Sequence, residues 1–323
     1  MGAVPGREAA GIIVLPRLLP ALALALVTAG AGTASPSATT TPGESLGAID
    51  GQRMGVVEAY VDPAAQRLVL TPEPGAGPRL KARYAGDARV VVTAEREPAR
   101  RASPAAVIGS PWAGSTATGG VPLTGEGRAC TLGFTGTRAG LPVFLTAGHC
   151  GAPGTAFTSR GGVIGVVESR VFPEKDYALG VLTRGYGSGV VTSPDGGAIP
   201  VRGSAPAPVG EQVCTIGATT GWSCGTVLAL DVTVRYGSGE GAQYVRGLTK
   251  VGVCTAGGDS GGPWLWGTQA QGLTSGGAGG PAATEAGRCG TGDGDGEAEA
   301  VAYFQPLAPI LTETGMVLDT DSR

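Results

Sequence analysis

Residues 257–263 read GGDSGGP, and this stretch decides how the rest of the chain is interpreted. A serine that attacks a carbonyl carbon needs glycines on both sides, because they allow a tight turn and close approach to main-chain N–H groups. Ser260 is therefore the candidate nucleophile, and the N–H groups of Gly258 and Ser260 are the candidate oxyanion hole. In a chain with 59 glycines among 323 residues, an ordinary loop is the alternative. The residues that a nucleophilic Ser260 would need as partners, a base and a carboxylate, decide between a catalytic turn and an ordinary loop.

A base is the first companion that Ser260 needs, because a serine hydroxyl is a weak nucleophile until its proton is removed. The only histidine is His149, in the stretch LTAGHC at 145–150. It follows a β-type run and adjoins Cys150. This context favours a catalytic base over a structural histidine.

A carboxylate that orients the imidazole is the second companion. Asp176, in FPEKDYALG at 172–180, precedes an apolar run and is the best-placed acid, with Glu174 and Asp231 as weaker candidates. The chain order His149, Asp176, Ser260 matches one of the known orders of a catalytic triad.

The composition predicts a turn-rich all-β fold. Glycine (59) and proline (24) are abundant, yet hydrophobic residues make up 42% and charged residues only 15%, which argues against a solvated disordered chain. The net charge of −3 lacks the basic footprint of a nucleic-acid-binding protein. Short β-type runs lie between Gly-rich turns at 143–146, 163–167, 178–182, 226–230, 264–266 and 301–304. Only residues 307–314 look helical.

The chain is expected to have three parts and to be secreted. Residues 1–34 resemble a signal peptide, because two arginines precede an apolar run at 18–30 that is too short to span a bilayer. Small residues at 29–31 and at 33–34 offer alternative cleavage sites. No other stretch predicts a membrane span. Residues 35–116 are expected to be a separate segment without cysteine, with strands at 55–71 and 89–93. A linker is expected over 98–120, and residues 117–323 form the remaining domain.

The cysteines fit export to an oxidising compartment, where an even number is typical of disulfides. Six cysteines allow fifteen pairings in principle. A zinc site is disfavoured, because the chain has one histidine and no CxxC pair. No metal or other cofactor is expected. The six are Cys130, Cys150, Cys214, Cys224, Cys254 and Cys289.

Taken together, LTAGHC, FPEKDYALG and GGDSGGP resemble the streptogrisin and α-lytic protease group, the bacterial branch of the chymotrypsin-type serine proteases. Residues 130–134 (CTLGF), 217–230 (GATTGWSCGTVLAL), 274–277 (TSGG) and 303–306 (YFQP) are similar to it as well. The resemblance covers about 117–310. Residues 56–71 (VVEAYVDPAAQRLVLT) are similar to the pro-segments of that group.

The resemblance implies two packed six-stranded antiparallel β-barrels with a short C-terminal helix, preceded by a small pro-segment. His149 would be general base and then acid, Asp176 the orienting carboxylate and Ser260 the nucleophile. The implied disulfides are Cys130–Cys150, Cys214–Cys224 and Cys254–Cys289. The implied substrate-binding residues are Thr274, Ser275, Gly276 and Gly277 on one wall and Thr255, Ala256 and Gly257 on the other.

The resemblance also implies a monomeric peptidase that acts on polypeptides, with a pro-segment that assists folding and inhibits until it is removed. Nucleic acids and membranes are not expected partners. The pocket stretches 255–258 and 274–277 are small and neutral, which predicts cleavage after large apolar or aromatic residues. A catalytically inactive relative that only binds and a non-enzymatic β-rich structural protein are the alternatives.

Two features depart from the family pattern. An arginine commonly follows the cysteine at Cys214 and neutralises the aspartate before the nucleophile, but Thr215 stands there, which leaves Asp259 without that partner. Arg128, Arg138 and a new amino terminus are the alternative partners. Residues 292–299 (GDGDGEAE) look like an insertion, with a solvated loop favoured over a calcium site because the EF-hand spacing fails.

Overall fold

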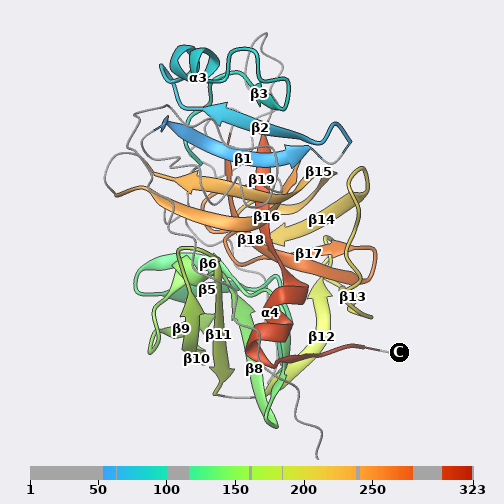
Figure 1. The fold of residues 1–323 in the computed structure, drawn as a ribbon. Helices are drawn as coiled ribbons and strands as arrows, with labels where there is room; N and C mark the ends of the chain where they lie inside the picture. The colour runs from blue at the N-terminus through green and yellow to red at the C-terminus, as the bar shows by residue number, and fades with distance from the viewer. Residues whose placement is uncertain are drawn as a thin grey trace, which may run out of the picture. The chain divides into compact units, whose positions relative to one another are not determined.

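The computed structural model describes residues 54–62, 64–99, 116–159, 162–183, 185–237, 241–278 and 300–321. The chain divides into two compact units, Met1–Thr40 and Thr41–Arg323, and the described residues all belong to the second. The expected signal peptide, most of the expected linker and the 292–299 insertion lie outside the described residues. The structure is described for the remainder (Figure 1).

Six strands from the C-terminal half form a closed antiparallel ring. Their order is β14-β17-β18-β19-β16-β15, and a pairing between β14 and β15 closes it. The ring fills with apolar side chains, among them Trp264 and Phe304, whose rings stack with centroids 5.1 Å apart. The strands are β14 (Gln212–Gly217), β15 (Gly221–Tyr236), β16 (Gln243–Val251), β17 (Pro263–Trp266), β18 (Gln269–Ala278) and β19 (Val301–Pro306).

A second sheet, green in Figure 1, comes mainly from the preceding half of the chain and has the order β20-β7-β8-β11-β10-β9-β5-β6. Phe144 and Phe157 meet edge to face inside it, 6.2 Å apart. Its strands are β5 (Pro122–Gly125), β6 (Arg128–Thr131), β7 (Thr135–Arg138), β8 (Leu141–Thr146), β9 (Ala156–Ser159), β10 (Gly162–Val171), β11 (Tyr177–Leu182) and β20 (Val317–Leu318).

The two sheets share one hydrophobic cluster. Phe134 and Leu145, from the region of the second sheet, pack in it with Leu265 and Leu273 from the ring. Because apolar side chains from both sheets are buried together, the residues where the two sheets meet are fixed by contacts from each of them. A third, small sheet joins β13 (Ala198–Pro200), β12 (Tyr186–Thr192) and β4 (Thr116–Gly119).

The prediction of a chain built mainly of β-strands is confirmed, and so is the short helix α4 (Leu307–Thr314) near its end. The second sheet contains eight strands where six were expected, and one of the eight, β20, returns from the C-terminal end to pair with β7. The helix α3 (Gly77–Arg83) was not predicted. With seven residues it is too short to display a helical repeat, and among its side chains longer than glycine only Leu80 is buried.

The segment before residue 99 extends the C-terminal ring. Strand β1 (Val56–Asp62) pairs with β15 through Glu58↔Val234 and Ala59↔Thr233, and β2 (Arg67–Pro72) and β3 (Val90–Val92) follow outward. The strands expected at 55–71 and 89–93 are therefore present. The Asp62 carboxylate accepts hydrogen bonds from the N–H groups of Ala64 and Ala65, which stabilises the turn between β1 and β2.

Two of the three expected disulfides are present, Cys130–Cys150 and Cys214–Cys224. The first joins β6 to the short helix that carries His149, and the second crosslinks β14 to β15. Cys289, the expected partner of Cys254, lies outside the described residues, so that pairing stays a prediction.

Removing the Cys214–Cys224 bond is expected to cost stability without rearranging the ring. The bond closes a chain segment with a sequence separation of 10, and in the chain-entropy view this stabilises the fold by roughly 3 kcal/mol. The double variant Cys214→Ser, Cys224→Ser should lower the free energy of unfolding in urea by about that amount. A change smaller than about 1 kcal/mol would show that the β14–β15 ladder alone fixes the hairpin.

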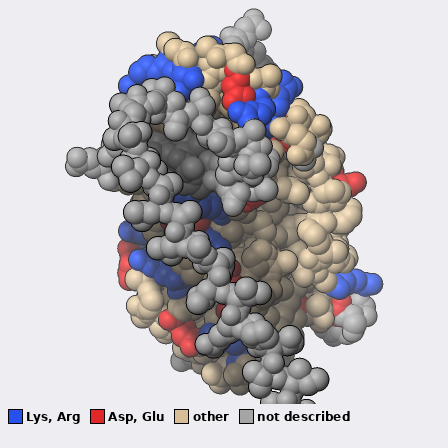
Figure 2. Space-filling view, viewed as in Figure 1, with Lys and Arg blue, Asp and Glu red and all other residues tan. Residues whose placement is uncertain are grey.

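Charged side chains are dispersed over the visible part of one face of the molecule. On the face shown in Figure 2, Lys and Arg lie in several small groups beside acidic side chains rather than in one continuous basic area. None of the helices in the described part of the chain combines the length and apolar character that a membrane span requires.

Candidate active site

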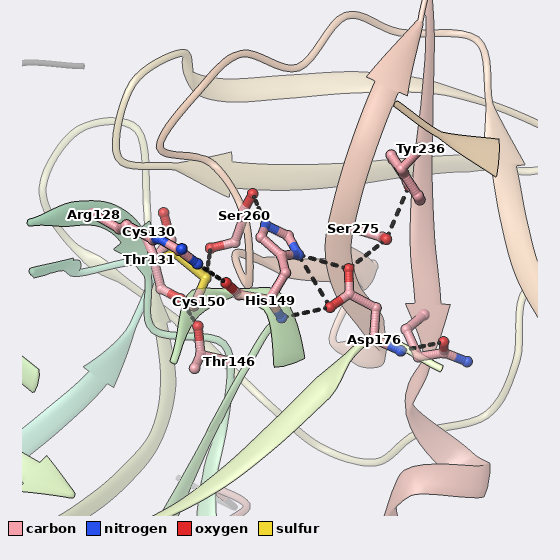
Figure 3. A network of polar contacts seen from close by, with 11 residues as sticks. Arg128, Cys130, Thr131, Thr146, His149, Cys150, Asp176, Tyr236, Ser260 and Ser275 are labelled. Carbon is pink, nitrogen blue, oxygen red and sulfur yellow. Dashed lines mark hydrogen bonds and ion pairs between the residues drawn. A yellow bond between two sulfur atoms is a disulfide. The ribbon is translucent and has the colours of Figure 1, made fainter. Parts of the chain in front are cut away.

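Three side chains from different elements meet at one point (Figure 3). His149 lies in the short helix η1 (Gly148–Cys150) that follows β8, and Asp176 directly precedes β11. Ser260 lies in the turn that leads into β17. The Nε2 atom of His149 is 2.8 Å from the Ser260 Oγ, and its Nδ1 is 2.8 Å from the Asp176 Oδ2. The structure thus brings together the three residues singled out in the sequence.

The carboxylate of Asp176 is fully buried and has several donors. It accepts the main-chain N–H of His149 at 3.0 Å and the Ser275 hydroxyl at 2.6 Å. Burial favours the neutral acid, but the neighbouring charge of His149 and these hydrogen bonds outweigh it and hold the pKa of Asp176 below its usual value. Asp176 is therefore ionised at neutral pH, as a group that orients an imidazole must be.

The two weaker candidate acids lie elsewhere. Glu174 forms an ion pair with Arg246 at 3.1 Å and is mostly exposed. Asp231 lies inside β15 with a φ of 54°, where the ladder with β16 shifts register. Neither carboxylate has a recorded contact with His149.

Two further residues of this network were missed in the sequence. The Gln305 side-chain oxygen accepts the main-chain N–H of Asp176 at 3.0 Å, and the Tyr236 hydroxyl donates to the Ser275 Oγ at 2.9 Å. Figure 3 shows Tyr236 beyond Ser275, which lies on the far side of Asp176 from His149. The available signal was Gln305, which directly follows the apolar run 301–304. An amide side chain that is buried with such a run needs a hydrogen-bond partner.

The turn around Ser260 leaves two N–H groups unused. Hydrogen bonds engage the N–H groups of Asp259, Gly261 and Gly262. In the part of the chain that is described, the N–H groups of Gly258 and Ser260 have no such partner. Gly258 has a φ of 103°, which disfavours any residue with a side chain. The two groups expected to form an oxyanion hole are therefore free to bind an oxygen atom.

The two expected pocket walls lie close together. Residues 274–277 belong to β18. A Cβ added to Gly277 would fall 2.8 Å from the Thr255 Oγ1, so these two positions face each other. The Thr274 hydroxyl is engaged elsewhere, because it accepts the Trp264 indole N–H at 2.9 Å and donates to the Gly262 carbonyl at 3.2 Å. Thr274 thus fixes the wall rather than offering a polar group to a ligand.

Two of the three alternative partners considered for Asp259 have other partners, and the third, a new amino terminus, stays a prediction. Arg128 donates to the His149 carbonyl oxygen at 2.9 Å, and Arg138 forms an ion pair with Glu168. The interpretation that either arginine replaces the missing family partner is therefore wrong. Thr215, which stands where that arginine was expected, donates to the Pro263 carbonyl oxygen at 2.9 Å.

Asp259 instead accepts four hydrogen bonds from uncharged groups. Its Oδ1 accepts the N–H groups of Thr219 at 2.9 Å and Thr220 at 3.0 Å, and its Oδ2 accepts the Ala256 N–H at 2.8 Å and the Thr220 hydroxyl at 2.7 Å. Burial of the carboxylate raises the pKa of Asp259, and these hydrogen bonds oppose that rise only in part. Among the described residues no cluster of three or more His, Cys, Asp or Glu side chains could hold a metal ion.

The chain is similar to known proteins over this region. The Trypsin family model matches residues 104–289. Streptogrisin-C of Streptomyces griseus is 35% identical over 285 residues, which cover 84% of this chain and 54% of the relative. Glutamyl endopeptidase 2 of Streptomyces griseus is 38% identical over 164 residues, which cover 50% of this chain and 85% of that protein. The chain spans about half the length of the streptogrisin-C relative that it matches.

Solved structures share the fold over about two thirds of this chain. Protease A of Thermobifida fusca superposes with a TM-score of 0.54 and 37% identity, covering 64% of this chain and all of that protein. The chymotrypsin of Cellulomonas bogoriensis superposes with a TM-score of 0.52 and 38% identity over the same shares.

Proposed function

Since the chain belongs to the trypsin family of serine proteases, we propose that it is a secreted serine endopeptidase that cleaves peptide bonds through an acyl-enzyme and is made with a pro-segment. One observation carries this proposal: an unbroken hydrogen-bonded line runs from the Ser260 Oγ through both ring nitrogens of His149 to the Asp176 carboxylate. Each member has the chemical character that its role requires.

The first half-reaction begins at Ser260. The Nε2 atom of His149, 2.8 Å from the Oγ, takes the hydroxyl proton as the oxygen attacks the substrate carbonyl carbon. The imidazolium that forms is stabilised by the Asp176 carboxylate at 2.8 Å. His149 then gives its proton to the leaving amine, the carbon–nitrogen bond breaks, and the acyl group stays on the Ser260 Oγ.

The second half-reaction returns Ser260 to its starting state. His149 takes a proton from a water molecule, whose oxygen attacks the ester carbon, and the proton passes to the Ser260 Oγ as the ester bond breaks. In both halves the carbonyl oxygen becomes negatively charged. The free N–H groups of Gly258 and Ser260 are suited to bind that charge, and one such donor contributes about 3 kcal/mol in related chemistry.

The proposed specificity follows from uncharged pocket walls. Residues 255–258 and 274–277 carry no ionisable side chain, and a charged substrate side chain buried there would lack a partner. His149 is the only histidine and is engaged by Asp176 and Ser260. We therefore propose cleavage after large apolar or aromatic residues, although one relative is named glutamyl endopeptidase.

A panel of peptide amides tests the specificity. With Phe, Leu, Ala, Arg or Glu before the scissile bond, kcat/KM should be highest for Phe or Leu, by at least about tenfold over Arg and Glu. Sequencing the amino terminus of the secreted protein in the same experiment locates the processing site. Fastest cleavage after Glu would place the chain's specificity with that of the glutamyl endopeptidase, and fastest cleavage after Arg would require an acid that the pocket walls lack.

The proposed pro-segment role is supported by the contacts of β1. Strand β1 pairs with β15, and its buried Glu58 pairs with Lys250 at 2.5 Å. A segment that donates both a strand and a buried charge to the ring is suited to assist its folding. We propose that residues 35–116 act in this way and inhibit the enzyme until they are removed.

A further inference from the structure

The turn between β14 and β15 holds the aspartate that precedes the proposed nucleophile. Asp259 is fully buried, and the four groups that donate to it are all uncharged. A buried carboxylate without hydrogen bonds is costly, so these donors fix where the side chain lies. Among the four, the Thr220 hydroxyl is the one that comes from a side chain.

Asp259 stands between the two residues whose N–H groups form the proposed oxyanion hole, Gly258 and Ser260. Its side chain anchors this backbone to the β14–β15 turn. A second hydrogen bond strengthens the anchor, because the Thr219 hydroxyl donates to the Gly257 carbonyl oxygen. A Cβ at Gly258 would fall only 2.2 Å from the Thr219 Oγ1, which shows how closely the turn packs on the loop.

We infer that Thr220 is a positioning residue for the proposed peptidase reaction, which holds Asp259 and through it the Gly258 and Ser260 N–H groups. The inference rests on the proposed function and assigns to Thr220 the task that the arginine expected at position 215 would perform. Thr215 cannot do so, since its hydroxyl donates to the Pro263 carbonyl oxygen.

The residues around Asp259 position its side chain without an ionisable group. The segments that contact it are 217–220, 256–258 and 261–262, and none of their residues has an ionisable side chain. His149 contacts Ser260 rather than Asp259. Loss of the Thr220 hydroxyl therefore leaves Asp259 with its three main-chain N–H donors.

Thr220→Val removes the hydroxyl and keeps the shape, and Thr220→Ser keeps the hydroxyl. We expect Thr220→Val to lower kcat by about tenfold or more with little change in KM. The inhibition constant of a peptide aldehyde, whose adduct places an oxyanion in the hole, should rise by a similar factor. Thr220→Ser should recover most of both. Thr158→Val, which removes the hydrogen bond from the Thr158 hydroxyl on β9 to the Thr124 carbonyl oxygen on β5, is the matched control and should behave as the wild type.

Amide hydrogen exchange on the same variants completes the test. Exchange of the hydrogen-bonded N–H groups of Ala256, Asp259 and Gly261 should become faster in Thr220→Val and remain slow in Thr220→Ser. Wild-type kcat, aldehyde affinity and exchange in Thr220→Val would overturn the inference, and so would equal impairment of the Val and Ser variants. A wild-type chain that cleaves no peptide would overturn the proposed function instead, and the exchange data would still decide whether Thr220 positions the loop.

Discussion

Replacing Ser260 with alanine is expected to lower kcat by about 10⁶-fold. The reason is that Ser260→Ala removes the oxygen that His149 activates, and with it the acyl-enzyme route. The remaining N–H groups and the substrate cleft would still leave a rate above that of the uncatalysed reaction. Steady-state hydrolysis of the best peptide amide measures the loss.

A double variant tests this prediction further, because the effects of Ser260 and His149 substitutions on kcat should not add. Because Ser260 and His149 act as one unit, the double variant Ser260→Ala, His149→Ala should be no worse than Ser260→Ala alone, within about threefold. Ser188→Ala is a matched control, since its hydroxyl donates only to the Ala117 carbonyl and the Thr118 side chain, away from the site. It should keep wild-type activity. A further loss of several decades in the double variant would contradict the shared mechanism.

Replacing Glu58 with alanine is expected to be the most destabilising change outside the site. The Glu58 carboxylate of β1 is buried against the ring, where it accepts from Lys250 at 2.5 Å and from the Tyr303 hydroxyl. Arg96, which like β1 belongs to the proposed pro-segment, lies 3.4 Å away. Burial and then the charge of Glu58 raise the pKa of Tyr303 well above its usual value, so this phenol stays a donor.

Glu58→Ala leaves the buried Lys250 ammonium without its carboxylate, which costs about 3–5 kcal/mol. Chemical unfolding of the unprocessed chain, in a Ser260→Ala background that prevents self-cleavage, measures the change. Glu58→Gln should fall between alanine and the wild type, because the amide keeps the shape but not the charge. Asp87→Asn, which breaks an exposed ion pair with Arg89 inside the same segment, should leave the midpoint unchanged. Equal midpoints for the Glu58 and Asp87 variants would show that the pair does not couple segment and ring.

The active-site residues were predictable because they lie in short sequence motifs that are specific for their roles. LTAGHC and GGDSGGP each specify a residue type and a backbone turn within seven residues. The structure brings His149, Asp176 and Ser260 together as that reading requires. The helix at 307–314 was predictable for a similar reason, because one short continuous stretch of sequence forms it.

Contacts between distant segments were not predictable. Glu58 and Lys250 are 192 residues apart and charged, and composition alone places such residues in water. Only residues 226–230 of β15 were recognised as a β-type run, although the strand extends from Gly221 to Tyr236. Asp231 interrupts the apolar pattern at a register shift. The partners of Asp259 escaped for a related reason: three of the four are main-chain N–H groups, which every sequence contains.

The central claim, that Ser260 is an activated nucleophile, is tested most directly by a fluorophosphonate that reacts covalently with such serines. The mature, folded protein should take up one probe molecule per chain, and mass spectrometry of the digest should place it on Ser260. Labelling should disappear in Ser260→Ala and persist in Ser188→Ala. Absence of labelling in the mature, folded wild type, or a label on another residue that survives in Ser260→Ala, would contradict the account.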